Sequence, residues 1–235
     1  YFMAGSDGSA FSNAVTLTDN ALLENAAGVG VHFLGGVKGP GDLHVKGGTF
    51  NFYETNTYGR LEVEGATTFA FHTNATLGAG RVHVAANAAL NLSFGDGTAA
   101  AVTNVFRKEA GAQMSLALDH AAPTFDTDVA FDALTLRNFS TLKVGGRVAF
   151  GSVSAAGASD KQIGKDGAEA SADGAELVVD NAADGTFALP LADGAGTLAF
   201  TKTGTGTLEL PRAARTNTGA TTVAQGALKL VDDPR

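Results

Sequence analysis

Acidic residues gather in one short stretch, where hydrolytic chemistry is conceivable. Asp126, Asp128 and Asp132 lie close together, and the first two would share one face if the segment is a strand. Hydrolysis of a glycosidic bond needs two carboxyl groups roughly 5 to 9.5 Å apart, and Ca²⁺ prefers carboxylate oxygens. The alternative is a solvated turn after Pro123, because aspartates bind local backbone amides. No basic cluster accompanies these residues in sequence to hold a polyuronate substrate.

A second candidate is TGTGTLEL at residues 203–210, since a Gly-x-Gly turn can bind a phosphate through its backbone amides. A dinucleotide-binding fingerprint also needs a third glycine and a following helix. Glu209 stands where that glycine would be, and the flanking LAFTKTG and TLELP are typical of strands. We therefore interpret Gly204 and Gly206 as turn residues, because glycine takes a positive φ without steric cost.

Composition limits the remaining chemistry. The chain has 235 residues, of which 31 are glycine and none is cysteine, so disulfides and thiolate metal sites are impossible. A formal net charge of -8 disfavours a nucleic-acid groove or an anionic membrane surface, since both need clustered Lys and Arg. No run of residues approaches the length of a membrane-spanning helix. The first residue is Tyr1 rather than Met, so we interpret the chain as a processed or truncated piece. We expect no cofactor.

Short runs of alternating apolar residues, broken by Gly, Asn and Asp, predict an all-β chain. Three runs share the pattern Gly-x-apolar-x-apolar and start at Gly41, Gly59 and Gly80, with steps of 18 and 21 residues. Such steps are typical of a solenoid, in which each unit buries its apolar face only against its neighbours. We predict parallel strands stacked in register about 4.8 Å apart.

In-register stacking predicts columns of side chains. The inward columns are Leu43, Leu61, Val82, then Val45, Val63, Val84, and then Phe50, Phe69, Leu90. The outward columns are Asp42, Arg60, Arg81, then His44, Glu62, His83, and then Lys46, Glu64, Ala85. The second outward column contains metal-ligating residue types, but its histidines would lie about 9.6 Å apart, too far for one ion. We interpret it as a solvated ladder and expect no metal site.

The repeat is uneven along the chain. We predict irregular N-terminal turns over 1–40, regular turns over 41–151, a flexible excursion over 152–175 and C-terminal turns over 176–235. The excursion is expected because its only large apolar residues are Val153 and Ile163, too few to offset chain entropy. The segment 117–129, which contains Pro123, is expected to bulge out between strands.

Tyr53 and Tyr58 flank a predicted corner, FYETNTYGR, and are the residue-level binding candidates. Tyrosine is enriched at interfaces, so these rings would suit stacking on a sugar or a partner surface. The alternative is that both rings simply pack against the shaft of the solenoid.

Two stretches near the C-terminus carry a longer pattern, LAFTKTGTGTLEL at 198–210 and NTGATTVAQGALKL at 217–230. They resemble the autotransporter-associated β-strand repeat of bacterial passenger domains, which reads K-x-G-x-G-x-L-x-L, then N-x-Y-x-G-x-T-x-V, then x-x-G-x-L-x-L. The matching positions are Lys202, Gly204, Gly206, Leu208, Leu210, Asn217, Gly219, Thr222 (or Thr221), Val223, Gly226, Leu228 and Leu230. The chain departs from the repeat in the corner at 211–215 and at Thr218, which replaces the usual Tyr.

This resemblance covers about thirty residues and implies a right-handed parallel β-helix. It also implies secretion by a Gram-negative bacterium, with attachment to the outer membrane through a barrel that lies outside this sequence. The expected function is a secreted or cell-surface scaffold or adhesin rather than an enzyme, with a host glycan, a host protein or a second copy as partner. The alternatives are a carbohydrate-active enzyme built on Asp126, Asp128 and Asp132, and a structural spacer with no ligand.

Overall fold

The computed structural model describes residues 2–4, 8–25, 29–78, 80–138, 140–155, 167–187, 190–211 and 215–231. Contacts divide the chain into two compact units, Tyr1–Ser115 and Leu116–Arg235, which are described separately. All regular structure in the described ranges is β-strand, and the strands pair in parallel. The prediction of an all-β parallel solenoid is therefore confirmed. The described part contains no helix long and apolar enough to cross a membrane.

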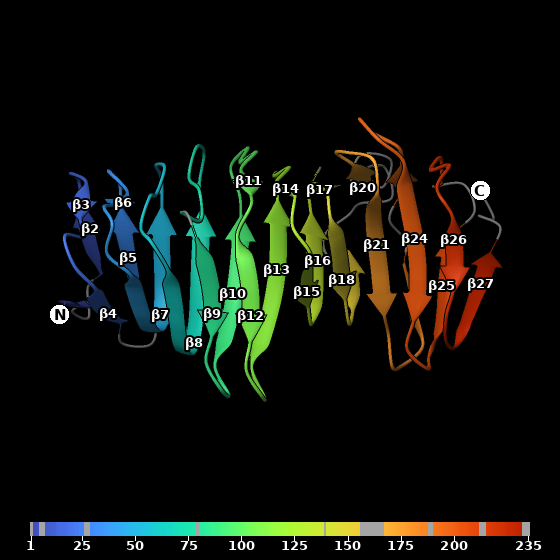
Figure 1. Ribbon diagram of the computed structural model, residues 1–235, viewed down its shortest axis with the longest axis horizontal. Coiled ribbons are helices and arrows are strands. Elements are labelled where there is room, and N and C mark those ends of the chain that lie inside the picture. The colour runs from blue at the N-terminus through green and yellow to red at the C-terminus, as the bar shows by residue number, and fades with distance from the viewer. Residues whose placement is uncertain are drawn as a thin grey trace. The chain divides into compact units, whose positions relative to one another are not determined.

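The first unit stacks parallel strands as successive turns of a solenoid (Figure 1). Its strands are β1 (Phe2–Ala4), β2 (Ser9–Phe11), β3 (Val15–Thr16), β4 (Ala21–Asn25), β5 (Gly30–Phe33), β6 (Val37–Lys38), β7 (Leu43–Phe52), β8 (Leu61–Phe71), β9 (Arg81–Val84), β10 (Ala89–Phe94), β11 (Ala101–Val102) and β12 (Val105–Lys108). β13 (Gln113–Asp119) begins in this unit and ends in the next. Since β4 pairs with β7 and β7 with β8, the neighbouring turns cover the apolar face of each turn.

A ladder of phenylalanines fills the core of the first unit. Its members, at matching register positions on successive turns, are Phe11, Phe33, Phe52, Phe71 and Phe94. Neighbouring ring centroids lie 4.8 to 5.7 Å apart, with interplanar angles of 8 to 19°. Stacking at these separations adds to the gain from burying each ring. The ladder also fixes which residues face outward, because a one-residue slip would reverse the two faces.

The predicted columns are confirmed except in one place. Leu43 pairs with Leu61 and then Val82, Val45 with Val63 and then Val84, and Phe50 with Phe69. Leu90, however, lies opposite Thr67, and it is Leu92 that lies opposite Phe69. The reason is a longer turn before β10, where Asn87 takes a φ of 59°. A two-residue shift keeps the same face inward, so Leu90 is still buried.

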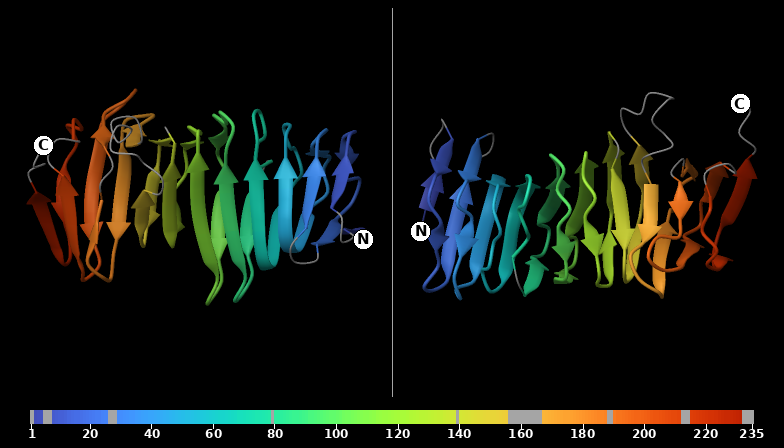
Figure 2. Two further views of the ribbon diagram at one scale, coloured as in Figure 1. Left: turned by 180° about the vertical axis from the view of Figure 1, so that it is seen from behind. Right: turned by 90° about the horizontal axis from the view of Figure 1, so that it is seen from above.

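The second unit is also a parallel solenoid, and Figure 2 shows its strands from two further sides. Its strands are β14 (Thr124–Phe125), β15 (Val129–Phe131), β16 (Ala133–Arg137), β17 (Thr141–Val144), β18 (Arg147–Phe150), β19 (Val153–Ala155), β20 (Gly167–Ala170), β21 (Ala175–Asp180), β22 (Gly185–Thr186), β23 (Leu191–Ala192), β24 (Leu198–Thr203), β25 (Thr207–Pro211), β26 (Thr221–Val223) and β27 (Ala227–Val231). One stack runs β15, β18, β21, β24, β26, and another runs β14, β17, β20, β23.

Strands occupy both sides of the stretch 152–175, which was predicted to be a flexible excursion. β19 pairs with β16 and β20 pairs with β17, so strands occupy parts of that stretch. Ala168 is buried opposite Leu142 of the preceding turn, and Leu142 supplies the larger of the two buried side chains. Residues 156–166, which include Ile163, lie outside the described residues.

The bulge predicted over 117–129 is wrong. Phe125 is fully buried and packs edge-on against Phe131, with ring centroids 5.6 Å apart. The carbonyl of Pro123 accepts a hydrogen bond of 3.0 Å from the Lys143 amide. A proline can therefore take part in the ladder here, because its position requires an acceptor and not a donor.

Candidate functional site

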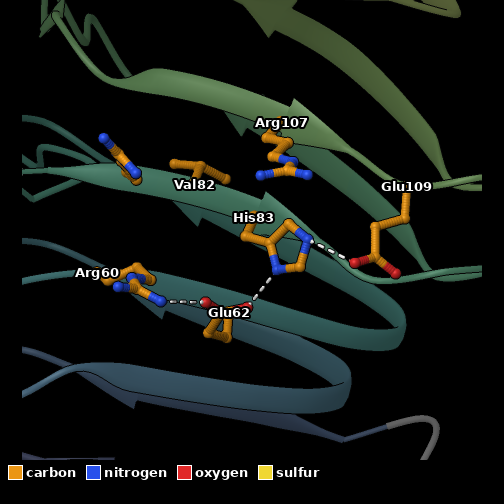
Figure 3. Close-up of a pocket in the computed structure, with 7 residues that line it drawn as sticks. Arg60, Glu62, Val82, His83, Arg107 and Glu109 are labelled. Atoms are coloured by element: carbon orange, nitrogen blue, oxygen red, sulfur yellow. Dashed lines mark hydrogen bonds and ion pairs between the residues drawn. The ribbon is translucent and has the colours of Figure 1, made fainter.

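The outward face of the first unit carries a hollow of about 340 Å³ over β8, β9 and β12 (Figure 3). We call it the arginine groove, and its lining residues are Arg60, Glu62, Arg81, Val82, His83, Arg107 and Glu109. Register places its centre, because His83 on β9 pairs with Glu62 on one side and with Arg107 on the other. Alternation along each strand turns Val82 into the core and leaves the charged residues on one face.

His83 bridges two carboxylates in this groove. Its Nδ1 lies 2.5 Å from Glu62 Oε2, and its Nε2 lies 3.1 Å from Glu109 Oε1. An imidazolium can donate to both carboxylates at once, whereas a neutral imidazole carries a single N–H. Arg60 extends the row, since its Nη1 donates to Glu62 Oε1 over 3.1 Å. These four side chains form one connected chain across successive turns of the solenoid.

The pKa of Glu62 reflects this chain of contacts. Burial alone would raise the pKa of its carboxyl, but hydrogen bonds from His83 and Arg60, together with their charges, hold it below its ordinary value. A general acid working near neutral pH needs a carboxyl pKa raised toward neutrality. Glu62 is therefore tuned to remain ionised and paired, which suits a structural role.

Two arginines of the groove differ from Arg60. Arg81 and Arg107 are exposed, and among the described residues no ion pair or hydrogen bond involves either guanidinium group. Figure 3 shows Arg107 beside His83, outside the dashed contacts. Val105, which lies opposite Arg81 in the register, is 58% exposed. An exposed apolar side chain thus lies beside the unpaired positive charge of the groove.

The three aspartates of the hydrolase alternative lie in connections rather than in strands. Residues 126–128 form no strand, so the condition under which Asp126 and Asp128 share a face is not met. Asp128 accepts a 2.8 Å hydrogen bond from the Arg147 amide, and Asp126 accepts one of 3.4 Å from the Ser171 hydroxyl. Asp132 is exposed just after β15. Within the described ranges, no three His, Cys, Asp or Glu side chains are placed to hold a metal ion.

The two candidate tyrosines are both packed against the shaft. Tyr58 is 1% exposed, and burial raises the pKa of its hydroxyl. Tyr53 is half-buried, and its ring stacks on His72 of the next turn with centroids 4.5 Å apart. On its other side lies His32 of the preceding turn, at 6.0 Å. Because histidines cover both faces of the Tyr53 ring, it offers no free face to a sugar.

The Gly-x-Gly stretch surrounds a cation of the protein itself. Lys202 is 0% exposed and takes an inward register position opposite Val179. Its ammonium donates to the carbonyls of Thr203, Gly204 and Gln225, the last two at 2.8 and 3.2 Å. Burial lowers the pKa of this amine. The turn therefore presents carbonyl oxygens, whereas a phosphate site needs N–H donors. This supports the interpretation of Gly204 and Gly206 as turn residues.

The glycines of the C-terminal repeat lie against the preceding turn. Gly204 and Gly226 have φ values of 76° and 72°. A Cβ at Gly206 would lie 2.3 Å from the Ala183 carbonyl oxygen, and one at Gly219 would lie 2.3 Å from that of Leu198. Larger residues therefore cannot replace these glycines without moving the backbone.

The leucines of the repeat behave differently on its two turns. Leu208 and Leu210 point inward as predicted and are 3% and 1% exposed. Leu228 and Leu230 pair with them on β27, but Leu230 is 53% exposed. The reason is position, because no strand of the described chain pairs with the outer edge of β27.

Sequence reasoning did not identify the arginine groove as a site. It placed Arg60 and Arg81 in one outward column, but Arg107 lies in a part of the chain whose repeat is too loose to align. The available signal was arginine recurring at outward positions of successive turns, without an acid opposite Arg81.

Comparison with known proteins adds no assignment. A scan against protein-family models found no match, and searches of the curated proteins and of the solved structures found none either. The autotransporter resemblance therefore rests on the C-terminal motif alone.

Proposed function

We propose that this chain is a segment of a secreted or cell-surface autotransporter passenger, acting as a β-solenoid scaffold or adhesin. Its partner would be a host glycan, a host protein or a second copy of the chain. The passenger assignment rests on the C-terminal motif, and the observation that carries the binding function is the pair of exposed guanidinium groups, Arg81 and Arg107, which have no partner among the described residues. Rigid strands hold such groups in place better than loops do, and arginine is well suited to contacts with another molecule.

The contacts of the acidic residues favour a scaffold over a carbohydrate-active enzyme. Asp128 binds the next turn through the Arg147 amide, and Asp126 binds Ser171, two turns on. Glu62 has a lowered pKa, whereas the general acid of a glycosidase has a raised one. These carboxylates are better explained as parts of the turns and ladders that hold the solenoid together.

A binding assay tests the adhesin function. The full chain, fluorescently labelled, is applied to a glycan array and to cultured host cells, and saturable binding to at least one surface is expected. Polysaccharides are then incubated with unlabelled chain and assayed for new reducing ends. Release of reducing ends that is lost in Asp128→Asn would overturn the proposal in favour of an enzyme. Binding to no surface and no copy of itself would leave the spacer alternative.

The proposed location is tested separately. An antibody raised against the purified chain is applied to intact cells of the source bacterium, before and after treatment with an external protease. Labelling of intact cells that the protease abolishes is expected of a surface-displayed passenger, and the chain in the culture medium is expected of a cleaved one. Signal that appears only after lysis would contradict both.

A further inference from the structure

The arginine groove differs in charge from the rest of the chain. The whole sequence has a formal charge of -8, yet the groove gathers three guanidinium groups against two carboxylates. Both carboxylates are held by His83, at 2.5 and 3.1 Å. Glu62 and Glu109 are thereby directed at the histidine, and neither forms an ion pair with Arg81 or Arg107 among the described residues. This leaves local positive charge that is available to an anion.

The two unpaired arginines lie on adjacent strands and are offset along them. Arg81 lies opposite Val105, and Arg107 lies two residues further along the same strand pair, opposite His83. Their backbones are therefore offset by one strand spacing, about 4.8 Å, and by two residues along the strand, about 6.6 Å. Each guanidinium presents a planar fork of donors that can bind an oxyanion through two hydrogen bonds. An extended ligand with an acidic group on neighbouring units can meet both arginines.

The surface in and beside the groove suits a sugar better than a nucleobase. Val105 is 58% exposed beside Arg81, and its methyl groups can contact the C–H face of a sugar ring. No Phe, Tyr or Trp is among the residues that line the groove, and the imidazole of His83 is held by Glu62 and Glu109, whereas proteins that bind single-stranded nucleic acid stack the bases on free aromatic rings. Duplex binding depends on many Lys and Arg contacts to phosphates, which a chain of charge -8 does not gather here.

We propose that Arg81 and Arg107 form a binding site for the sulfate or carboxylate groups of an anionic polysaccharide, with Val105 contacting a sugar ring between them. This inference rests on the proposed adhesin function and names its ligand class and its site. Arg60 is not a ligand in this proposal, because it is already bound to Glu62 over 3.1 Å. Its role is to hold that carboxylate away from the free arginines.

Binding of defined polysaccharides to the full chain tests the site. Heparin supplies sulfate groups, polygalacturonate supplies carboxylates, dextran is the neutral control and duplex DNA is the phosphate polyanion of another class. We expect at least one of the two anionic polysaccharides to bind and dextran not to bind. The double variant Arg81→Gln, Arg107→Gln should weaken that binding at least about tenfold. The double variant Arg81→Lys, Arg107→Lys keeps the charge but loses the planar fork of donors. Its affinity should lie between those of the parent and the Gln variant.

A matched control separates this site from general charge. The double variant Lys143→Gln, Lys229→Gln also removes two positive charges, but from surface positions of the second unit. It should change the affinity less than about twofold. Equal losses in the two double variants would overturn the proposal, as would tighter binding to DNA or no binding to either anionic polysaccharide. If the Gln variant still adheres to host cells as the parent does, the adhesin function stands and this site assignment is false. Circular dichroism checks that each variant is folded.

Discussion

The arginine groove of the first unit and the Lys202 corner of the second unit use buried or partly buried charge in opposite ways. In the groove, Glu62 and His83 stand on outward positions and satisfy each other across adjacent turns. At the corner, Lys202 stands on an inward position, in a column that continues Phe150 and Val179. The same alternation of a strand thus sends one charged group toward solvent and another into the core.

The two regions also differ in what the charge binds. The groove pairs side chain with side chain, so each member can be exchanged with a small loss. The corner pairs an ammonium with main-chain carbonyls, so loss of the lysine removes the donor that the carbonyls of Gly204 and Gln225 share. We therefore expect the corner to control stability and the groove to control binding. Four substitutions, taken from the largest expected effect to the smallest, test this difference.

Lys202→Ala is expected to cause the largest loss. It removes a fully buried stem and leaves the carbonyls of Gly204 and Gln225 without their donor, so the free energy of unfolding should fall by about 3 kcal/mol. Urea denaturation followed by circular dichroism measures it. Lys229→Ala is the control, since it removes a surface lysine paired with Glu209 and should cost less than about 0.5 kcal/mol. Similar losses in both variants would show that burial of Lys202 has no energetic consequence.

Gly204→Ala is expected to rank second. Gly204 has a φ of 76°, and a Cβ there would lie 2.4 Å from the Asn181 carbonyl oxygen. Gly174 in the same unit has a φ of 83° with nothing within 4 Å of a Cβ, so it isolates the cost of the backbone conformation. Gly174→Ala should cost about 1 kcal/mol and Gly204→Ala at least about 2 kcal/mol. If thermal unfolding gives the two variants the same loss, close packing of the turn is not what requires glycine at 204.

The fold could be predicted from sequence because strand alternation and the repeat step carry it. The columns through Leu43 and Val45 follow directly from residues that recur at a constant offset. The displacement of Leu90 could not be foreseen, because it depends on how two extra residues fold in the turn near Asn87. Pro123 misled the prediction for the same kind of reason, since only the register shows that its position needs no N–H.

The candidate site was harder to predict than the fold. Glu62 and His83 were placed in one outward column, and the structure confirms that pairing. The two-sided contact of His83 requires Glu109, which lies after β12 in a stretch with no clear repeat. Likewise, Lys202 matched a motif position, but its inward direction follows from the register with Val179. These contacts depend on the register between strands that are far apart in the sequence. A single sequence indicates that register only where the repeat is regular.

Tyr58→Phe is expected to stabilise the fold, whereas Lys202→Ala is expected to destabilise it. The Tyr58 hydroxyl is buried and has no hydrogen-bond partner among the described residues, so removing it should raise the free energy of unfolding by about 1 kcal/mol. Lys202→Met is the counterpart, because it keeps an apolar stem but deletes bonds that are made, and should cost about 1–3 kcal/mol. Loss of stability in Tyr58→Phe, measured by urea denaturation, would mean that the hydroxyl is bound after all.

Glu62→Gln is expected to have the smallest effect, and one that depends on pH. His83 and Arg60 hold the pKa of this carboxyl below its ordinary value of 4.5 despite burial, which alone would raise it. A carboxyl with a lower pKa in the folded state stabilises the fold fully above the unfolded pKa, and this contribution is lost as pH falls through the folded pKa. At neutral pH the substitution should therefore cost about 0.5–1 kcal/mol.

The loss should shrink as the pH falls below about 4.5, the ordinary value, because the parent carboxyl is then becoming protonated as well. Urea denaturation at a series of pH values from neutral to acid measures both the cost and its slope. Glu64→Gln is the control, since Glu64 is the next outward residue on β8 and is exposed, and the slope of this variant should match that of the parent. If Glu62→Gln also kept the parent slope, the bridge through His83 would contribute nothing to stability.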